Sequence, residues 1–210
     1  LVIDVSGSLD FGTAGQLKRE CVTEIAATLA FSAIQNNDKI GVIFFSDHVE
    51  KYIPPKKGRK HILYLIREML TFTPNSKKTD VGVGLEYLNK VVKRRCTAFV
   101  ISDFYTRKDF SQELRITNRK HDVVAIQVYD PRAKVMPDVG LLKVIDAETG
   151  HEMYVDTHDI RVRKAHNTYW EEREQRLHDI LTQSHVDSVA IATNDDYVKM
   201  LITLFLKRRR

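Results

Sequence analysis

Several motifs that identify enzymes are missing from this sequence. Its 210 residues contain no GxxxxGK(S/T) loop, so nothing indicates that the chain itself hydrolyses ATP. No GxSxG element supports a serine hydrolase. The eight histidines form neither an HExxH motif nor a Cys/His cluster with zinc spacing, so surface or internally hydrogen-bonded histidines are the better interpretation.

Cysteine and long apolar runs are also scarce. Cys21 and Cys96 match no CxxC pattern, and we expect them to be buried thiols in a reducing compartment. No stretch approaches the roughly 20 apolar residues of a membrane span. The chain shows no signal peptide and begins directly with strand residues, so we expect an upstream segment, which would carry any membrane anchor. The expected location of residues 1–210 is the cytoplasm.

The charge balance is basic but not patterned for nucleic acid. A net charge of +5 comes from small groups of Lys and Arg, and aromatic residues are not interleaved with them as a stacking platform requires. Solvated helix ends explain most of these groups. We therefore expect no specific nucleic-acid binding, and a basic surface that favours an acidic protein partner or membrane headgroups. The basic groups lie at residues 56–60, 93–95 and 207–210.

Apolar runs typical of buried strands alternate with stretches of helical periodicity. A short return strand at 49–53 should end at Pro54 and Pro55, and the segment 142–155 suggests a hairpin around Glu148, Thr149 and Gly150. Core strands are expected at 39–45, 98–101, 123–129 and 186–192, and the clearest helices at 14–35, 81–92, 159–183 and 196–206.

This alternation predicts an α/β fold with a doubly wound, mostly parallel central sheet flanked by helices. The return strand would be one antiparallel edge strand, and the hairpin would follow late in the chain. A length of 210 residues with 43% apolar content suits a single domain of this class, spanning residues 1–210.

The first eight residues carry the clearest chemical signal. An apolar run enters Asp4, Ser6 and Ser8, with Gly7 allowing a tight bend between the two serines. Asp4 supplies negative charge and the serines supply neutral oxygens, which together suit a hard cation. An ordinary polar turn that caps the following helix is the alternative interpretation.

Two later residues could complete such a site. Asp103 follows the apolar run 98–101, as Asp4 follows the first run, and the carboxyl ends of parallel strands lie side by side. Two neighbouring carboxylates repel each other unless a positive charge lies between them. Thr79 precedes a helical stripe, and taken alone it is better explained as the N-cap of that helix.

Together, Asp4, Ser6, Ser8, Thr79 and Asp103 resemble the five ligands of the metal-ion-dependent adhesion site of von Willebrand factor A domains. The run IGVIFFSD, the PPxxGR segment and the closing TNDDY further resemble the bacterial family called domain of unknown function 58. This resemblance covers essentially the whole chain. It implies a von Willebrand factor A-like fold and a metal-dependent protein-binding module rather than an enzyme.

The resemblance also implies a cofactor and a partner. The cation would be Mg²⁺, with Mn²⁺ or Ca²⁺ as alternatives, and Asp103 and Thr79 would exchange direct and water-mediated contact with it. A partner's carboxylate would complete the coordination shell. Members of this family are typically encoded beside MoxR-type AAA+ ATPases, so such an ATPase or its client is the implied partner, in chaperone-like protein maturation.

A Mg²⁺-dependent phosphatase or phosphotransferase that uses Asp4 as its nucleophile is the competing hypothesis. Such enzymes need a second acid two residues later, where this chain has Ser6. No lysine is evidently placed to neutralise a phosphoryl group.

Overall fold

The predicted alternation of strands and helices is present in the structure, a computed structural model that describes residues 1–13, 15–147 and 149–208. One six-stranded sheet has the order β3-β2-β1-β4-β5-β8; β3 pairs antiparallel with β2, and the other pairings are parallel. The predicted fold class is therefore confirmed. The strands are β1 (Val2–Asp4), β2 (Ile40–Phe45), β3 (Val49–Lys56), β4 (Thr97–Ser102), β5 (Asp122–Tyr129) and β8 (Asp187–Ala192).

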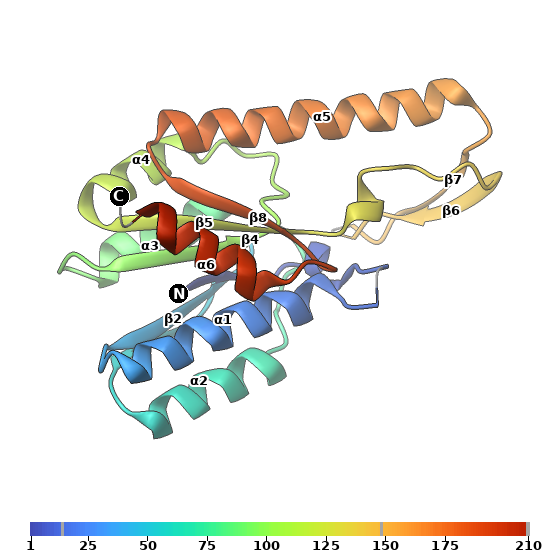
Figure 1. Cartoon of the computed structure of the whole chain (residues 1–210). Helices are drawn as coiled ribbons and strands as arrows, with labels where there is room; N and C mark the ends of the chain where they lie inside the picture. The colour runs from blue at the N-terminus through green and yellow to red at the C-terminus, as the bar shows by residue number, and fades with distance from the viewer. Residues whose placement is uncertain (14, 148, 209–210) are drawn as a thin grey trace.

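Helices cover both faces of the sheet and make a three-layer arrangement (Figure 1). Neighbouring residues of β1 show why both faces need cover: Ile3 packs in one core and Val2 in the other. Burying each such side chain contributes about 1.5–3 kcal/mol. One face carries α1 (Lys18–Gln35), α2 (Arg59–Thr71) and α6 (Tyr197–Arg208); the other carries α3 (Val81–Val91), α4 (Ser111–Lys120) and α5 (Ile160–Gln183).

The chain reverses its direction of winding between β1 and β4. Strands β2 and β3 lie on one side of β1, whereas β4, β5 and β8 lie on the other. The register pairs Ile3 with Ile101, so Asp4 and Ser102 end neighbouring strands. Such a switch point leaves a crevice at the carboxyl ends of the strands, where ligands bind in α/β folds.

The predicted hairpin is present as β6 (Leu141–Ile145) and β7 (Glu152–Asp156). It follows a short 3-10 helix, η2 (Pro131–Ala133), and leads into α5. Figure 1 shows the hairpin and the first turns of α5 extending past the carboxyl ends of the central strands. Both elements therefore lie on the same side of the molecule as the switch point. Glu148, within the predicted turn, is outside the described residues.

Two predicted boundaries were wrong for local reasons. Strand β3 continues through Pro54 and Pro55 to Lys56, because an edge strand tolerates residues that cannot donate to a second neighbour. Helix α1 begins at Lys18, because Gly15 has φ +88° and Leu17 is extended. Ala14, where the helix was predicted to start, is outside the described residues, as are the last two residues of the basic C-terminal group.

The prediction that both thiols are buried holds for one of the two. Cys21 is buried in the core, but Cys96 is only half-buried, beside His121 at the amino end of β4. Both cysteines are free. Within the described ranges, none of the helices combines the length and the apolar character that crossing a bilayer demands.

Candidate metal centre

The first loop of the candidate site starts where β1 ends. Asp4 is fully buried, and its Oδ1 accepts a hydrogen bond of 2.8 Å from the backbone N–H of Ser6. A short 3-10 helix, η1 (Gly7–Asp10), then turns the chain so that the hydroxyls of Ser6 and Ser8 lie 3.1 Å apart. The Asp-x-Ser-x-Ser pattern therefore brings two hydroxyls together next to a buried carboxylate.

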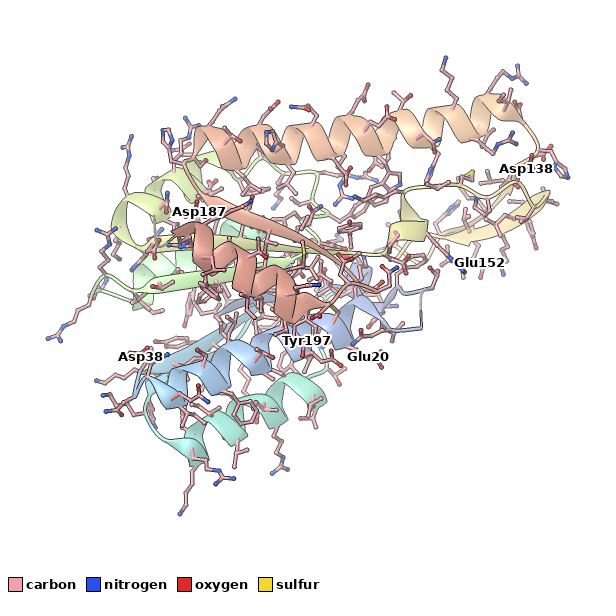
Figure 2. The ribbon with its side chains drawn as sticks, in the orientation of Figure 1. Glu20, Asp38, Asp138, Glu152, Asp187 and Tyr197 are labelled. Atoms are coloured by element: carbon pink, nitrogen blue, oxygen red, sulfur yellow. The ribbon has the colours of Figure 1, made fainter. Side chains whose placement is uncertain are left out.

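Gly7 is required by lack of space rather than by an unusual backbone angle. A Cβ at this position would lie 2.8 Å from the carbonyl oxygen of Ala147 and 2.9 Å from the Cβ of Lys77. Ala147 belongs to the turn between β6 and β7, so the hairpin folds back onto the first loop. Figure 2 shows Glu152 of β7 and Glu20 of α1 at this end of the sheet, whereas Asp38 and Asp187 lie at the opposite end.

The second loop follows β4 and carries Asp103. The Ser102 hydroxyl donates a 2.5 Å hydrogen bond to Oδ2 of Asp4, which ties the two strand ends together. Burial, and next the nearby Asp103 carboxylate, raise the pKa of Asp4 to about 7, although hydrogen bonds from Ser102 and Ser6 oppose the rise. Near neutral pH, Asp4 therefore carries a proton part of the time unless a cation offsets the repulsion.

Asp103 has an unexpected partner in the first residue of α1. The Nζ of Lys18 lies 2.5 Å from Oδ2 of Asp103, and both side chains are over 90% buried. Burial would raise the pKa of Asp103, but the Lys18 charge, followed by its hydrogen bond, holds that pKa below its ordinary value. Sequence reasoning found no lysine evidently placed to neutralise a phosphoryl group, and it missed Lys18 because 85 residues separate Lys18 from Asp103.

Arg173 of α5 also faces the Asp103 loop. Its Nη2 lies 3.3 Å from the backbone carbonyl oxygen of Asp103 and donates to it. The guanidinium packs on the rings of Tyr105 and Trp170, 4.0 and 4.8 Å from the two centroids. The backbone N–H of Tyr105 donates to Oδ1 of Asp103 at 2.9 Å. Helix α5 of the outer layer therefore contacts the candidate site, and Arg173 brings a positive charge to it.

The third loop, between α2 and α3, brings Thr79. The carbonyl oxygen of Lys77 accepts a 3.0 Å hydrogen bond from the Gly7 N–H, and the carbonyl oxygen of Thr79 accepts one of 3.2 Å from the Thr106 hydroxyl. Thr79 is thus held between the loop of Asp4 and the loop of Asp103. Its own Oγ1 is buried and has no hydrogen-bond partner.

The position of Thr79, taken alone, suggests that it is the N-cap of α3, but it is not. The N-cap is Asp80, and its carboxylate pairs with Lys108 Nζ at 2.6 Å instead of capping the helix. The Thr79 hydroxyl is therefore left without a structural role in the helix. An unpaired buried hydroxyl costs about 1–3 kcal/mol, and the Thr79 hydroxyl is free to contact a ligand.

Glu50 of β3 holds the third loop in place. Its inaccessible carboxylate accepts hydrogen bonds from the Ser46 hydroxyl and from the backbone N–H groups of Asn75 and Ser76, at 2.8–3.1 Å. Burial opposes ionisation of Glu50, but these hydrogen bonds outweigh it and keep its pKa below the ordinary value. Sequence reasoning missed this residue because its partners in the third loop, Asn75 and Ser76, lie 25 and 26 residues away.

The five predicted ligands therefore come from three loops that contact one another at the carboxyl edge of the sheet. Two carboxylates and three hydroxyls are hard oxygen donors of the kind that Mg²⁺ and Ca²⁺ prefer. Within the described ranges, no group of three or more His, Cys, Asp or Glu side chains could hold a metal ion, so such a site depends on the hydroxyls. The unpartnered hydroxyl of Thr79 fits a cation, although in this structure Lys18 neutralises Asp103.

Sequence comparisons place this chain among proteins without a known activity. The model of the family described as "Protein of unknown function DUF58" matches residues 1–176. Uncharacterised proteins of Mycobacterium tuberculosis and Mycobacterium bovis are each 34% identical to the chain over 152 residues, which is 71% of this chain and 48% of each relative. The chain thus spans about half the length of these curated relatives.

Solved structures resemble the fold at low sequence identity. BatB, a conserved hypothetical protein from Bacteroides thetaiotaomicron, has a TM-score of 0.64 at 14% identity, covering 98% of this chain and 95% of its own. An aerotolerance-related membrane protein from Bacteroides fragilis has a TM-score of 0.66 at 13% identity, with coverages of 98% and 96%. The SpRpn10 VWA domain has a TM-score of 0.51 at 12% identity, with coverages of 98% and 92%. The fold is von Willebrand factor A-like.

Proposed function

Because this chain belongs to the family described as protein of unknown function DUF58, a description that names no activity, we propose a function from its own site. The domain is a metal-dependent protein-binding adaptor rather than an enzyme. A divalent cation, Mg²⁺ or alternatively Mn²⁺ or Ca²⁺, is held at the switch point and engages an acidic group of a partner protein. The residues that hold it are Asp4, Ser6, Ser8, Thr79 and Asp103.

The buried, unpartnered hydroxyl of Thr79 carries this proposal. Folding has placed it between two loops that each present a buried carboxylate, where a cation would satisfy all three groups. The raised pKa of Asp4 supports the same interpretation, because a cation would relieve the repulsion from Asp103 that contributes to it. Bound Mg²⁺ would supply an open coordination position for an acidic oxygen.

Charge favours an acidic partner. The two carboxylates balance one dication, and Lys18 and Arg173 then leave the occupied site with surplus positive charge. The chain as a whole carries a net charge of +5, which attracts acidic surfaces over longer distances. A carboxylate of the partner would therefore be attracted both by the bound cation and by the basic residues around it.

We assign the partner from the family resemblance: a MoxR-type AAA+ ATPase or its client, in chaperone-like protein maturation. The chain acts as one domain of residues 1–210 and works in the cytoplasm, where its two free thiols stay reduced.

One observation favours the competing phosphotransferase, because Lys18 now supplies the cation that such an enzyme needs beside its acids. The environment of Asp4 argues against it. Both carboxylate oxygens accept hydrogen bonds, the side chain has no exposed surface, and its pKa is raised to about 7, which are poor properties for a nucleophile. Magnesium-dependent hydrolysis of a generic phosphomonoester that is lost in Asp4→Asn would favour the enzyme.

Thermal melting tests the metal proposal. At a hundredfold excess of Mg²⁺ or Mn²⁺ over its Kd, binding to the folded state adds about 2.7 kcal/mol, or roughly 5–10 °C in Tm. Asp103→Ala and the milder Ser8→Ala should remove the shift, whereas Ser32→Ala on the exposed surface of α1 should keep it. A wild type with the same Tm in metal and in chelator rejects the cation site.

Pull-down of the ATPase tests the partner. Capture by the wild type should need the divalent cation and should fail with Ser8→Ala. Capture that is indifferent both to chelator and to Ser8→Ala would reject a metal-bridged contact, while an adaptor role through another surface would stand.

A further inference from the structure

Lys18 is the charged group of the site that metal binding itself does not use. As the first residue of α1 it lies at the positive end of the helix dipole, where a lysine is disfavoured. It is nevertheless buried, with Nζ 2.5 Å from Oδ2 of Asp103. Its position is explained by Asp103 and not by the helix.

The ion pair blocks the carboxylate that a cation would need. Oδ2 of Asp103 accepts a hydrogen bond from the Lys18 ammonium, and Oδ1 accepts one from the backbone N–H of Tyr105. Both oxygens are therefore engaged. Because the Tyr105 hydrogen bond belongs to the local turn of the loop, the Lys18 contact is the one that a side-chain movement can release.

A second environment lies close to the Lys18 ammonium. Its Nζ lies 5.9 Å from the centroid of the half-exposed Phe11 ring. Burial would raise the pKa of the Asp130 carboxyl at the end of β5, but hydrogen bonds from Thr13 and Arg132, and then the charge of the nearby Lys18, keep that pKa below its ordinary value. A rotation of the lysine side chain would exchange the Asp103 carboxylate for this surrounding.

We propose that Lys18 is a tethered competitor of the metal: its ammonium neutralises Asp103 in the metal-free protein, and a divalent cation displaces it towards Phe11 and Asp130. This inference rests on the proposed function, since it concerns how the same site is filled. Lys18 then sets the cation concentration at which the domain becomes able to bind its partner. No bond is made or broken in this exchange of ionic partners.

Isothermal titration with MgCl₂ at fixed ionic strength measures the competition. Lys18→Met should bind Mg²⁺ roughly tenfold or more tightly than the wild type, because the cation no longer displaces an ion pair. Arg19→Met is the matched control: it removes the same charge from the same helical turn, but Arg19 pairs with Asp10 at the surface. It should change the affinity by no more than about twofold.

A second measurement uses only the wild type, so it does not depend on the folding of a variant. An acetylating reagent modifies accessible lysines, and mass spectrometry gives the rate at each position. Mg²⁺ should raise the acetylation rate of Lys18 several-fold, while Lys51, which pairs with Glu68 outside the site, should be unaffected.

The outcomes separate the two claims. Equal Mg²⁺ affinities in wild type and Lys18→Met, or a Lys18 that stays protected while Mg²⁺ raises the Tm, would overturn the competition and leave the metal site intact. If Mg²⁺ neither binds to nor stabilises any of the three proteins, the proposed function itself fails.

Discussion

Acidic side chains are buried at the carboxyl edge of the central sheet and exposed at its amino edge. At the carboxyl edge, Asp4 and Asp103 are 0% and 5% exposed, and the cation that pairs with Asp103 is buried with it. At the amino edge, Asp122 pairs with Arg208 at 2.5 Å, but its side chain is 38% exposed, and the nearby Asp187 is 61% exposed. The same sheet therefore ends in buried carboxylates on one side and in solvated ones on the other.

Stability explains the exposed carboxylates of the amino edge more easily than the buried ones of the carboxyl edge. Exposed ion pairs cost little and add little, and they suit the end of a structural element. Buried carboxylates and an unpaired hydroxyl are expensive, and apolar residues in their place would often stabilise a fold. Residues that lower stability in this way are expected where a protein binds something. The predictions below compare residues of the candidate site with residues outside it.

The largest effect is expected from removing one buried acid. Asp103→Ala breaks the buried ion pair with Lys18, so it should lower the free energy of unfolding by up to about 3–5 kcal/mol. Asp122→Ala at the amino edge should cost about 0–1 kcal/mol, because Asp122 is partly exposed and Arg208 keeps its contact with Asp187. Urea denaturation in chelator measures both; equal losses would remove the distinction between the edges.

A smaller loss is expected from loosening the third loop. Glu50→Gln replaces an inaccessible, multiply hydrogen-bonded carboxylate and should cost about 1–3 kcal/mol, and it should also weaken Mg²⁺ binding by misplacing Thr79. The control, Glu68→Gln, breaks the partly exposed pair with Lys51 and should change neither Mg²⁺ affinity nor stability by much. Identical Mg²⁺ affinity in Glu50→Gln and wild type would show that Glu50 does not position the site.

The stability of the protein should depend on pH through Asp4 at the carboxyl edge. Because the folded-state pKa of Asp4 is raised from 3.8 to about 7, the folded protein keeps a proton that the unfolded chain releases. The stability of the metal-free protein therefore falls as the pH rises from about 4 to about 7. Mg²⁺ must displace this proton below pH 7, so its affinity should drop by up to about tenfold per pH unit there.

Denaturation in chelator, with Mg²⁺ titrations from pH 5 to pH 8, measures this dependence. Asp4→Asn should lose the contribution that falls between pH 4 and 7, whereas Asp187→Asn at the amino edge should keep the wild-type profile. A profile shared by wild type and Asp4→Asn would mean that Asp4 ionises normally in the folded protein.

The smallest effect on stability is expected at Thr79. Thr79→Val removes an unpaired buried hydroxyl, so the metal-free protein should be unchanged or more stable by up to about 1 kcal/mol. Thr193→Val removes another unpaired buried hydroxyl, just after β8, and should have the same effect on stability in chelator. Calorimetric melting with Mg²⁺ should distinguish them: the metal shift shrinks in Thr79→Val and persists in Thr193→Val. A full shift in Thr79→Val would exclude its hydroxyl as a ligand.

Much of the fold could be predicted because its signals are local. Apolar runs that end in Asp4 and in Ser102 indicate buried parallel strands whose carboxyl ends meet, and the register of β1 and β4 confirms that they do. The β6–β7 hairpin was equally readable from its turn residues. Pro54 and Pro55 misled the prediction of β3, because sequence alone does not show that a strand lies at an edge.

The partners inside the site could not be predicted, because they join residues far apart in the chain. Lys18 reaches Asp103 across 85 residues, and Ser102 reaches Asp4 across 98. Neither pattern is periodic, and a lysine at the start of a helix is usually solvated. Ser102 offered the one available signal, since it ends a buried strand next to the acid.

Diffraction from crystals soaked in Mn²⁺ tests the cation site most directly, because the anomalous signal locates the ion. The account predicts one Mn²⁺ bound to the hydroxyl oxygens of Ser6 and Ser8, with Thr79 and Asp103 next to it and the Lys18 ammonium moved away from Asp103. A site without Mn²⁺ at saturating concentration, with Lys18 still paired to Asp103, would contradict it.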